Sequence, residues 1–219
     1  MRGVFVTGTG TEVGKTVVAA AIARTAAAAG EGVAVFKPAV SGLDDLDARG
    51  EPDHELLRRA AGSKQSDVDV APYRFGPALS PHLAAALAGE QIDPERLIRS
   101  ARAAAEGADC VVAEGVGGFL VPLNPSYLVR DFARELGLPI VIAASPGLGT
   151  INHTLLTIEA VRAAELEVKA VVLTPWPSEP EEIHRSNRET IAELGGVEVE
   201  TLPMIDLGRT ESWPALDLA

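Results

Sequence analysis

A glycine-rich segment near the N-terminus, residues 8–16, has the residue types and order of a phosphate-binding loop. It reads Gly-Thr-Gly-Thr-Glu-Val-Gly-Lys-Thr and stands between a short apolar run and an alanine-rich stretch that begins at Val17. Glycines let the backbone curl so that its N–H groups point inward, and the following helix adds the positive end of its dipole. In such loops the lysine, here Lys15, reaches the β- and γ-phosphate oxygens, and the Thr16 hydroxyl binds Mg²⁺. The strict pattern has glycine where Thr9 stands, but the order of strand, loop, Gly-Lys-Thr and helix is retained.

Three charged side chains farther along the chain extend this candidate site. Lys37 follows the apolar run at residues 33–36, Asp53 opens a predicted helix, and Glu114 ends a second apolar run. Open α/β sheets bind ligands at the carboxyl ends of their strands, where Lys37 and Glu114 would stand. Carboxylates suit Mg²⁺, which takes few protein oxygens and leaves its other positions to water and phosphate. Singly these residues fit a surface lysine, a helix N-cap and a strand-end charge, but together they favour Mg²⁺ at Thr16, Asp53 and Glu114, with Lys37 facing the γ-phosphate.

The elements that must position these residues alternate between short β-branched runs and longer segments rich in Ala, Leu, Glu and Arg. This alternation is typical of βαβ units and of strands buried on both faces. We predict one domain over residues 1–219 with a three-layer α/β/α fold and a mostly parallel sheet, similar to P-loop NTPases. The expected strands cover residues 3–7, 33–37, 109–114, 139–144, 170–174 and 198–202. The expected helices cover residues 15–29, 55–61, 94–106, 129–136, 150–164 and 181–194.

Two stretches between these elements carry loop signals. Residues 42–53 are acidic and contain glycine, which favours a mobile loop. Residues 72–81 begin and end with proline, which favours an irregular excursion from the sheet.

Composition and charge disfavour several classes of function. The 219 residues are 47% hydrophobic and 23% charged, as in a globular chain with an ample core. The net charge of −12 opposes general binding to nucleic acid and to anionic membranes, so a bound phosphate would depend on a focused local site. The longest apolar stretch, residues 17–30, is interrupted by Arg24 and is shorter than the roughly 20 residues of a membrane span.

The single cysteine, Cys110, lies in an apolar run and is interpreted as a small buried side chain and not a nucleophile. One cysteine excludes an intramolecular disulfide and a cysteine zinc cluster. The N-terminus also lacks the charged n-region of a signal peptide, and its apolar strand leads directly into the glycine-rich loop, so we expect no signal peptide. These features predict a cytoplasmic protein.

Taken together, the motifs resemble those of the dethiobiotin synthetases. The matching blocks have the family's order and spacing from residue 4 to about 175. The blocks are residues 7–16, Lys37-Pro38 with Ser41-Gly42, residues 71–75 followed by Ser80-Pro81-His82, Glu114-Gly115 with Gly117-Gly118, and residues 148–153. The Lys-Pro-x-x-Ser-Gly and Gly-Thr-Ile-Asn-His blocks are not general features of NTPases. The combination is therefore more specific than the glycine-rich loop alone.

The resemblance implies a ligase that converts 7,8-diaminopelargonic acid, carbon dioxide and ATP into dethiobiotin, ADP and phosphate. One amine captures carbon dioxide as a carbamate, a carbamate oxygen attacks the γ-phosphate, and the other amine closes a cyclic urea by expelling phosphate. The family further implies that Lys37 stabilises the carbamate and the transferring phosphoryl group, assisted by Lys15 and the Thr11 hydroxyl. It also implies a homodimer with its sites at the interface, with no nucleic-acid or membrane partner.

Binding residues are carried over from the same resemblance. Ser41 would hydrogen-bond the diamine end, and the substrate carboxylate would lie at a helix N-terminus, supplied in the family by the partner subunit and formed by Gly149, Thr150, Ile151 and Asn152. His153 is interpreted as a packing or dimer-contact residue and not a general base. The implied nucleotide-binding residues are Glu12, Val13, Gly14, Lys15, Thr16, Val17, Asp53, Glu114, Gly115, Val116, Gly117, Thr174, Pro175, Pro203, Met204, Ile205 and Glu211.

The chain departs from the family pattern at three places. Most members have aspartate where Gly10 stands and alanine where Val116 stands. Many also carry an asparagine, which reads the adenine edge, at the position of Thr174. An amide offers a base both a donor and an acceptor, whereas Thr174 offers one hydroxyl and Pro175 offers no N–H. We therefore expect relaxed base selectivity, so that nucleoside triphosphates other than ATP are accepted.

Three other classes of protein remain to be weighed. A ParA- or MinD-like ATPase, acting as a nucleotide-dependent dimer switch, would need a second lysine where Gly10 stands and a DNA or membrane surface that the charge of −12 disfavours. The synthetase domain of a cobyrinate-type amidotransferase would continue into a glutaminase domain with a cysteine nucleophile, for which no room remains after residue 219. A non-catalytic nucleotide-binding module would leave Lys37, Ser41 and Asn152 without a role.

Overall fold

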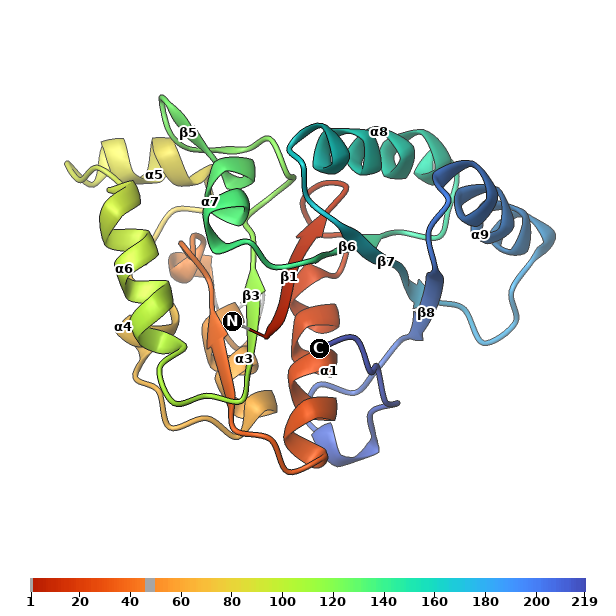
Figure 1. Ribbon diagram of the computed structural model, residues 1–219, viewed down its shortest axis with the longest axis horizontal. Helices are drawn as coiled ribbons and strands as arrows, with labels where there is room; N and C mark the ends of the chain where they lie inside the picture. Colours follow the sequence, from red (N-terminus) through yellow and green to blue (C-terminus); the bar gives the residue numbers. More distant parts are fainter. Residues whose placement is uncertain (1, 46–49) are drawn as a thin grey trace.

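A six-stranded parallel sheet forms the centre of the molecule. The computed structural model describes residues 2–45 and 50–219. The strands are β1 (Gly3–Gly8), β2 (Val33–Phe36), β3 (Cys110–Glu114), β6 (Ile140–Ala144), β7 (Val168–Trp176) and β8 (Val199–Pro203), in the order β2-β3-β1-β6-β7-β8 (Figure 1). In the register of the sheet, Phe36 of β2 lies opposite Ala113 of β3, and Val6 of β1 lies opposite Glu114. The predicted fold class and all six predicted strands are confirmed.

Helices connect the strands on both faces of the sheet. They are α1 (Lys15–Ala28), α3 (Asp53–Ala61), α4 (Asp67–Val70), α5 (Pro81–Leu87), α6 (Pro94–Ala104), α7 (Val129–Leu136), α8 (Thr150–Ala163) and α9 (Glu182–Gly195). Two 3₁₀ turns, η1 (Leu43–Asp45) and η2 (Thr210–Ser212), and a hairpin of β4 (Pro122–Asn124) and β5 (Tyr127–Leu128) stand outside this framework. Among the described residues, none of the helices is long and apolar enough to cross a membrane.

The six predicted helices are confirmed, with ends that differ by at most two residues from those expected. Helices α4 and α5 and the β4–β5 hairpin were not predicted. Residues 72–80 are irregular, as their prolines indicated. The prediction of a mobile loop at residues 42–53 falls partly on residues 46–49, which lie outside the described residues.

Alternate residues of the central strands face two separate hydrophobic cores. Phe5 of β1 packs in the core beneath α5 to α9, whereas its neighbours Val4 and Val6 pack in the core beneath α1 and α3. In the first core the ring centroid of Phe132, from α7, lies 5.9 Å from that of Phe5 and 5.8 Å from that of Phe36. Burial on both faces explains why these strands read as continuous apolar runs.

The buried face of helix α1 consists largely of alanine. Residues 18–23 are at most 1% exposed. The helix begins after Gly14, whose φ of +85° lies in the left-handed region that favours glycine. A Cβ at this position would lie 2.5 Å from Cγ2 of Thr174, at the end of β7. Contact between the loop and β7 therefore requires the glycine that precedes Lys15.

The outer edge of β2 is bonded to a side chain and not to another strand. The amide of Gln65 accepts a hydrogen bond from the Val35 N–H at 2.9 Å and donates one to the Val35 carbonyl at 3.1 Å. Gln65 thus occupies both outward backbone groups of Val35.

The C-terminal segment is fastened along α1 (Figure 1). The Leu216 N–H donates to the Thr25 hydroxyl at 2.9 Å, and the Trp213 indole N–H donates to the Asp206 carbonyl at 2.7 Å. Trp213, Leu216 and Leu218 are buried in the core that α1 shares. The last residues therefore complete the α1 side of the core.

Candidate active site

Four segments far apart in the sequence meet at the carboxyl edge of β1, β2 and β3. The glycine-rich loop links the end of β1 to α1, and Lys37 directly follows β2. Glu114 is the last residue of β3, and Asp53 is the first residue of α3. Because the strands are parallel, their last residues gather at one edge of the sheet.

The ammonium group of Lys37 is the centre of a set of hydrogen bonds that joins these segments. We call its members, Lys37, Asp53, Glu114 and Thr16, the Lys37 group. Its Nζ lies 2.6 Å from Oε1 of Glu114 and 2.7 Å from Oδ2 of Asp53. The Thr16 hydroxyl donates to the same Oε1 of Glu114 at 2.9 Å. The side chains of Lys37 and Glu114 are 4% and 0% exposed, whereas that of Asp53 is 46% exposed. The group therefore opens toward solvent on the Asp53 side.

Burial and mutual charge set the protonation of this group. Burial alone would lower the pKa of Lys37, but the carboxylates of Asp53 and Glu114 outweigh it and raise that pKa above its usual value. The Lys37 ammonium holds the pKa of the Asp53 carboxyl below its usual range. Burial raises the pKa of Glu114, and the charge of Lys37 opposes that rise. The short contacts favour an ammonium between two carboxylates.

Lys15 lies beside this group without being bonded to its carboxylates. Its Nζ donates to the Gly10 carbonyl at 2.7 Å, and its side chain is buried. Burial lowers the pKa of Lys15 to about 8, against the opposing charge of Glu114. Lys15 is thus a cation held across the glycine-rich loop by a neutral partner.

The oxygens of Thr16, Asp53 and Glu114 fit a divalent cation. A hydroxyl and two carboxylates are hard donors of the kind that Mg²⁺ takes from proteins. Glu114 Oε2 is buried and has no hydrogen-bond partner among the residues that the structure describes. A buried carboxylate oxygen without a donor is costly, and a bound cation would satisfy it.

The glycines of the loop differ in how much space there is for a Cβ atom at each position. A Cβ at Gly8 would lie 2.7 Å from Cγ2 of Val13 and 2.9 Å from Cγ of Lys15, so the end of β1 needs glycine. A Cβ at Gly10 would meet no described atom within 4 Å. The position where most family members are expected to carry aspartate therefore has room for a side chain.

The remaining predicted residues around the loop lie on its outer side. Thr11 and Glu12 are exposed, and Glu12 has a φ of +61°. Gly115, Val116 and Gly117 continue from Glu114 into a turn, and a Cβ at Gly118 would lie 3.8 Å from the Gly8 carbonyl oxygen. The turn after β3 is therefore packed against the glycine-rich loop.

Most of the predicted base-binding residues lie on a more open surface. Thr174 is buried against Gly14, and its bond to Pro175 is a cis peptide. Met204 is 78% exposed, and Pro203 and Glu211 are also exposed, whereas Ile205 is half-buried. In the described part of the chain, no hydrogen bond or ion pair joins these residues to the Lys37 group.

Among the described residues, no hydrogen bond or ion pair joins the predicted substrate-binding residues to the Lys37 group either. Ser41 follows an isolated bridge between Val40 and Arg74. Gly149, with a φ of +91°, precedes α8 and provides no side-chain cap for the first turn, which contains Thr150, Ile151 and Asn152. Helix N-termini leave backbone N–H groups without intrahelical acceptors, so this turn can receive an anion.

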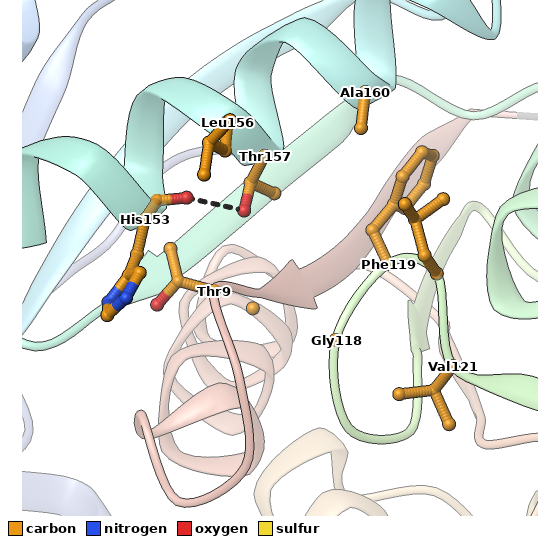
Figure 2. A pocket seen from close by; sticks show the side chains of 10 residues that line it. Thr9, Gly118, Phe119, Val121, His153, Leu156, Thr157 and Ala160 are labelled. Atoms are coloured by element: carbon orange, nitrogen blue, oxygen red, sulfur yellow. Dashed lines mark hydrogen bonds between the residues drawn. The ribbon is translucent and has the colours of Figure 1, made fainter.

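A cavity of about 400 Å³ lies between the glycine-rich loop, the turn after β3 and α8. Figure 2 shows Thr9 and His153 on one side of it and Phe119 and Val121 on the other. Leu120 and Leu156, which also line it, are 54% and 56% exposed. Sequence reasoning singled out His153 but missed the apolar lining; for residues 119–121 of that lining the only signal was their position directly after Gly117-Gly118.

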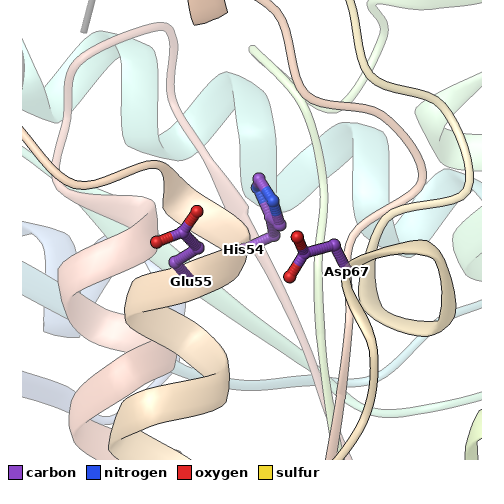
Figure 3. A group of neighbouring side chains, drawn as sticks. All are labelled: His54, Glu55 and Asp67. Atoms are coloured by element: carbon purple, nitrogen blue, oxygen red, sulfur yellow. The ribbon is translucent and has the colours of Figure 1, made fainter.

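A second group of titratable side chains, His54, Glu55 and Asp67, lies beside the start of α3 (Figure 3). One potential ligand atom of each lies within 4.8 Å of the others. Asp67 is already paired with Arg58 at 2.5 Å, and consecutive residues on a helix diverge by about 100°. Burial lowers the pKa of His54, which favours its neutral form. We interpret this group as support for α3, which carries Asp53.

Comparison with known proteins identifies close relatives in sequence. Residues 2–207 match a family described as an AAA domain. The chain is 44% identical over 195 residues to an ATP-dependent dethiobiotin synthetase BioD of Anaeromyxobacter dehalogenans (strain 2CP-1 / ATCC BAA-258), covering 89% of this chain and 86% of that protein. It is 36% identical over 201 residues to the protein of the same name from Bacillus subtilis (strain 168), covering 91% and 85% of the two chains.

Solved structures with the same architecture are more distant in sequence. A ParA family ATPase from Chlorobium tepidum TLS has a TM-score of 0.56 at 13% identity, covering 93% of this chain and 84% of that chain. The cell division ATPase MinD of Pyrococcus furiosus also has a TM-score of 0.56, at 15% identity and with the same coverage. At this level of identity the likeness extends to the fold alone.

Proposed function

This chain belongs to the family of ATP-dependent dethiobiotin synthetases, ligases of biotin biosynthesis, and from that premise we propose how its residues perform the reaction. The reaction joins 7,8-diaminopelargonic acid and carbon dioxide in a cyclic urea at the expense of ATP. Each intermediate before ring closure, the carbamate and then the mixed anhydride with phosphate, carries negative charge. A site for this reaction therefore needs cations and oriented N–H groups near the γ-phosphate.

The glycine-rich loop is proposed to hold the phosphates of ATP. The first turn of α1 has no side-chain cap at Gly14, so the N–H groups of Lys15, Thr16 and Val17 are oriented toward an anion. The Lys15 ammonium would exchange the Gly10 carbonyl for phosphate oxygens. Glu12 and Val13 complete the loop.

The oxygens of Thr16, Asp53 and Glu114 would hold Mg²⁺. When bound, this ion neutralises charge on the β- and γ-phosphate oxygens. The chain itself supplies the hydroxyl and both carboxylates from α1, α3 and β3, within one bonded group. Mutual neutralisation with Lys37 keeps two acidic groups close together before any ligand arrives.

Lys37 is the proposed catalytic cation. Its ammonium stabilises the carbamate oxygens and then the phosphoryl group as it is transferred, with help from Lys15 and the Thr11 hydroxyl. Ser41, which follows the same β2 segment, hydrogen-bonds the diamine end. Ring closure expels phosphate, whose oxygens can accept the proton that the attacking amine loses. The observation that carries this assignment is the buried Lys37 ammonium between Asp53 and Glu114, next to the glycine-rich loop.

The nucleotide base would lie over the open surface at the ends of β7 and β8. This surface consists of Pro175, Pro203, Met204, Ile205 and Glu211 beside the buried Thr174, with Gly115, Val116 and Gly117 on the phosphate side. Thr174 has a single hydroxyl, and its methyl group faces Gly14. Little hydrogen-bonding capacity remains there to distinguish one base from another, so we propose that other nucleoside triphosphates also serve.

The active form is proposed to be a homodimer. The first turn of α8, at Gly149, Thr150, Ile151 and Asn152, would bind the carboxylate of the substrate held by the other subunit. Leu148 is 94% exposed beside this turn, and the exposed Leu120 and Leu156 line the neighbouring cavity. Clustered exposed apolar side chains of this kind mark protein contact surfaces.

The dimer can be tested by sedimentation velocity. We expect the unmodified chain to sediment as a dimer and Leu156→Glu to shift it to a monomer with a raised KM for the diamine. Leu87→Glu, at a residue that is 67% exposed on α5, should remain dimeric and serves as the matched control. A monomeric unmodified chain with full activity would contradict the proposal.

The remaining proposals concern the cellular compartment of the protein and its binding partners. We place the enzyme in the cytoplasm because its single cysteine, Cys110, is a buried free thiol, as a reducing compartment allows. Its partners would be small molecules, since a net charge of −12 offers no broad basic surface to nucleic acid or membranes.

One incubation tests the function as a whole. The chain is mixed with diaminopelargonate, bicarbonate, Mg²⁺ and ATP, and dethiobiotin is sought by mass spectrometry. We expect one dethiobiotin for each phosphate released. Phosphate release without the cyclic urea would contradict the synthetase assignment and would leave a simple ATPase of the same fold.

A further inference from the structure

The two residues that form ion pairs with Lys37 are also proposed ligands of Mg²⁺. Lys37 contacts Glu114 Oε1 at 2.6 Å and Asp53 Oδ2 at 2.7 Å, and the third proposed ligand, Thr16, donates to that same Glu114 oxygen. All three proposed ligands are therefore engaged in one group that is centred on an ammonium. A divalent cation bound there would face Lys37 across the same carboxylates.

Two like charges cannot share these oxygens at low cost in a buried site. The Lys37 side chain is 4% exposed and Glu114 is fully buried, so water screens little of the repulsion between an ammonium and a metal ion. The lysine side chain, in contrast, has a flexible four-carbon stem, so its ammonium can move while the backbone at the end of β2 stays in place. Binding of the metal is thus expected to move Lys37 and not Glu114.

Two features of the Lys37 group favour the replacement of the ammonium by a divalent cation. Within residues 2–45 and 50–219, Glu114 Oε2 is buried without a hydrogen-bond partner, so one ammonium and one hydroxyl leave this carboxylate incompletely satisfied. Two carboxylates carry two negative charges, and a divalent cation matches them where Lys37 supplies a single positive charge. Phosphate oxygens of a bound nucleotide would provide the displaced ammonium with new anionic partners.

We propose that Lys37 is the resident cation of the metal site in the nucleotide-free enzyme, and that Mg²⁺ arriving with nucleotide displaces its ammonium toward the substrate side. This inference rests on the proposed function, because it takes the metal ligands from there. It makes the catalytic lysine available only when the phosphoryl donor is loaded. It also predicts weak binding of free metal to the empty enzyme.

Metal affinity of the nucleotide-free protein provides the test. Mn²⁺, which is visible by electron paramagnetic resonance, serves as the probe and is titrated against the unmodified chain, Lys37→Met and Lys15→Met. Lys15 is the matched control because it places an equal charge near Asp53 and Glu114 while its Nζ contacts the Gly10 carbonyl. We expect Lys37→Met to bind Mn²⁺ at least about thirtyfold more tightly than the unmodified chain, and Lys15→Met to gain no more than about threefold.

Equal gains for the two variants, or no gain for Lys37→Met, would overturn the proposal. Adding Glu114→Gln to Lys37→Met should abolish the gain, which assigns the Mn²⁺ to this group. If the chain with nucleotide requires Glu114 for metal binding but Lys37→Met shows no gain, only the displacement fails. If Glu114→Gln leaves metal binding unchanged with nucleotide present, the proposed metal site fails, and the displacement fails with it.

A second measurement does not depend on the folding of a variant. Removing a buried ammonium leaves Glu114 uncompensated, and such losses destabilise proteins strongly. The unmodified chain is therefore labelled with ¹³C-lysine, and the Cε resonance of Lys37 is followed by nuclear magnetic resonance. We expect it to move when Mg²⁺ and a nonhydrolysable ATP analogue are added together, and to stay in place with Mg²⁺ alone at millimolar concentration. An unchanged resonance in the ternary mixture would overturn the proposal.

Discussion

The two halves of the carboxyl edge of the sheet differ in how far their side chains are buried and bonded to one another. On the β2-β3-β1 side, Lys37 and Glu114 are buried and bonded to each other. On the β6-β7-β8 side, Leu148 is 94% exposed and Met204 is 78% exposed. The half that is proposed to perform chemistry is assembled within one chain, whereas the half that is proposed to recognise the base and the substrate carboxylate is open.

The difference follows from what each half must bind. Charged groups of opposite sign can hold one another in place, so Lys37 and the proposed metal ligands form one group within the chain itself. Recognition of an apolar chain and a planar base uses surfaces that are covered only by the ligand or by a second subunit. Four changes would break or sharpen this contrast, and they are ordered from the largest expected effect to the smallest.

Removing Lys37 should have the largest effect. In Lys37→Ala we expect turnover to fall by at least about a thousandfold while nucleotide binding is retained, because a positive charge that stabilises the transition state is lost. Steady-state formation of dethiobiotin and calorimetric nucleotide binding measure the two quantities. Lys64→Ala, at an exposed lysine, is the control and should retain full activity. Nearly unchanged turnover in Lys37→Ala would show that Lys37 has only a structural role in ion pairs and no catalytic role.

Neutralising Glu114 should raise the requirement for metal. In Glu114→Gln the Mg²⁺ concentration for half-maximal activity is expected to rise at least about tenfold, because one carboxylate ligand loses its charge. Activity measured across a Mg²⁺ titration gives this value. The exposed residue Glu106 provides the matched control, since Glu106→Gln should leave the titration curve in place. Superimposable curves for the two variants would exclude Glu114 as a metal ligand.

The charge of Lys15 predicts a pH dependence of nucleotide affinity. Burial lowers the pKa of Lys15 to about 8 in the free chain, and phosphate binds the charged form, so binding raises that pKa. Affinity should therefore be constant below about pH 8 and should fall up to tenfold per pH unit above it. Calorimetry with a nonhydrolysable ATP analogue from pH 7 to about 9.5 measures this. A gain in affinity with rising pH would contradict a role for charged Lys15.

The choice of base should have the smallest effect. Because Thr174 offers one hydroxyl and Pro175 offers no N–H, we expect turnover with other nucleoside triphosphates to lie within about tenfold of that with ATP, or roughly 1.4 kcal/mol. Dethiobiotin formation with ATP, GTP, CTP and UTP at equal concentration tests it. A preference for ATP of several hundredfold would show that the open half recognises the base after all.

The organised half was also the half that sequence reasoning described best. Lys37 and Glu114 were expected at one edge of the sheet because each follows an apolar run, and the structure places them 2.6 Å apart. The contact itself could not be predicted, because it depends on β2 pairing with β3 so that Phe36 lies opposite Ala113. A pattern of apolar residues identifies strands but does not fix which strands are neighbours.

Elements that the sequence did not reveal are short and lie outside the sheet. Helix α5 has seven residues, too few for a helical period to stand out, and β4 and β5 have three and two residues. On the open side, the sequence supplied Gly149 and Asn152 through family resemblance. It could not show that Leu148 and Leu156 would be exposed beside them, since apolar residues usually predict a core.

The side-chain amide of Gln65 has a consequence for how copies of this chain meet. The β2 edge of a parallel sheet is a template to which a strand from another molecule can add, which leads to aggregation. With the N–H and carbonyl of Val35 already bonded to Gln65, an incoming strand finds no continuous row of partners on β2. One glutamine side chain therefore blocks the addition of a strand at the β2 edge of the sheet.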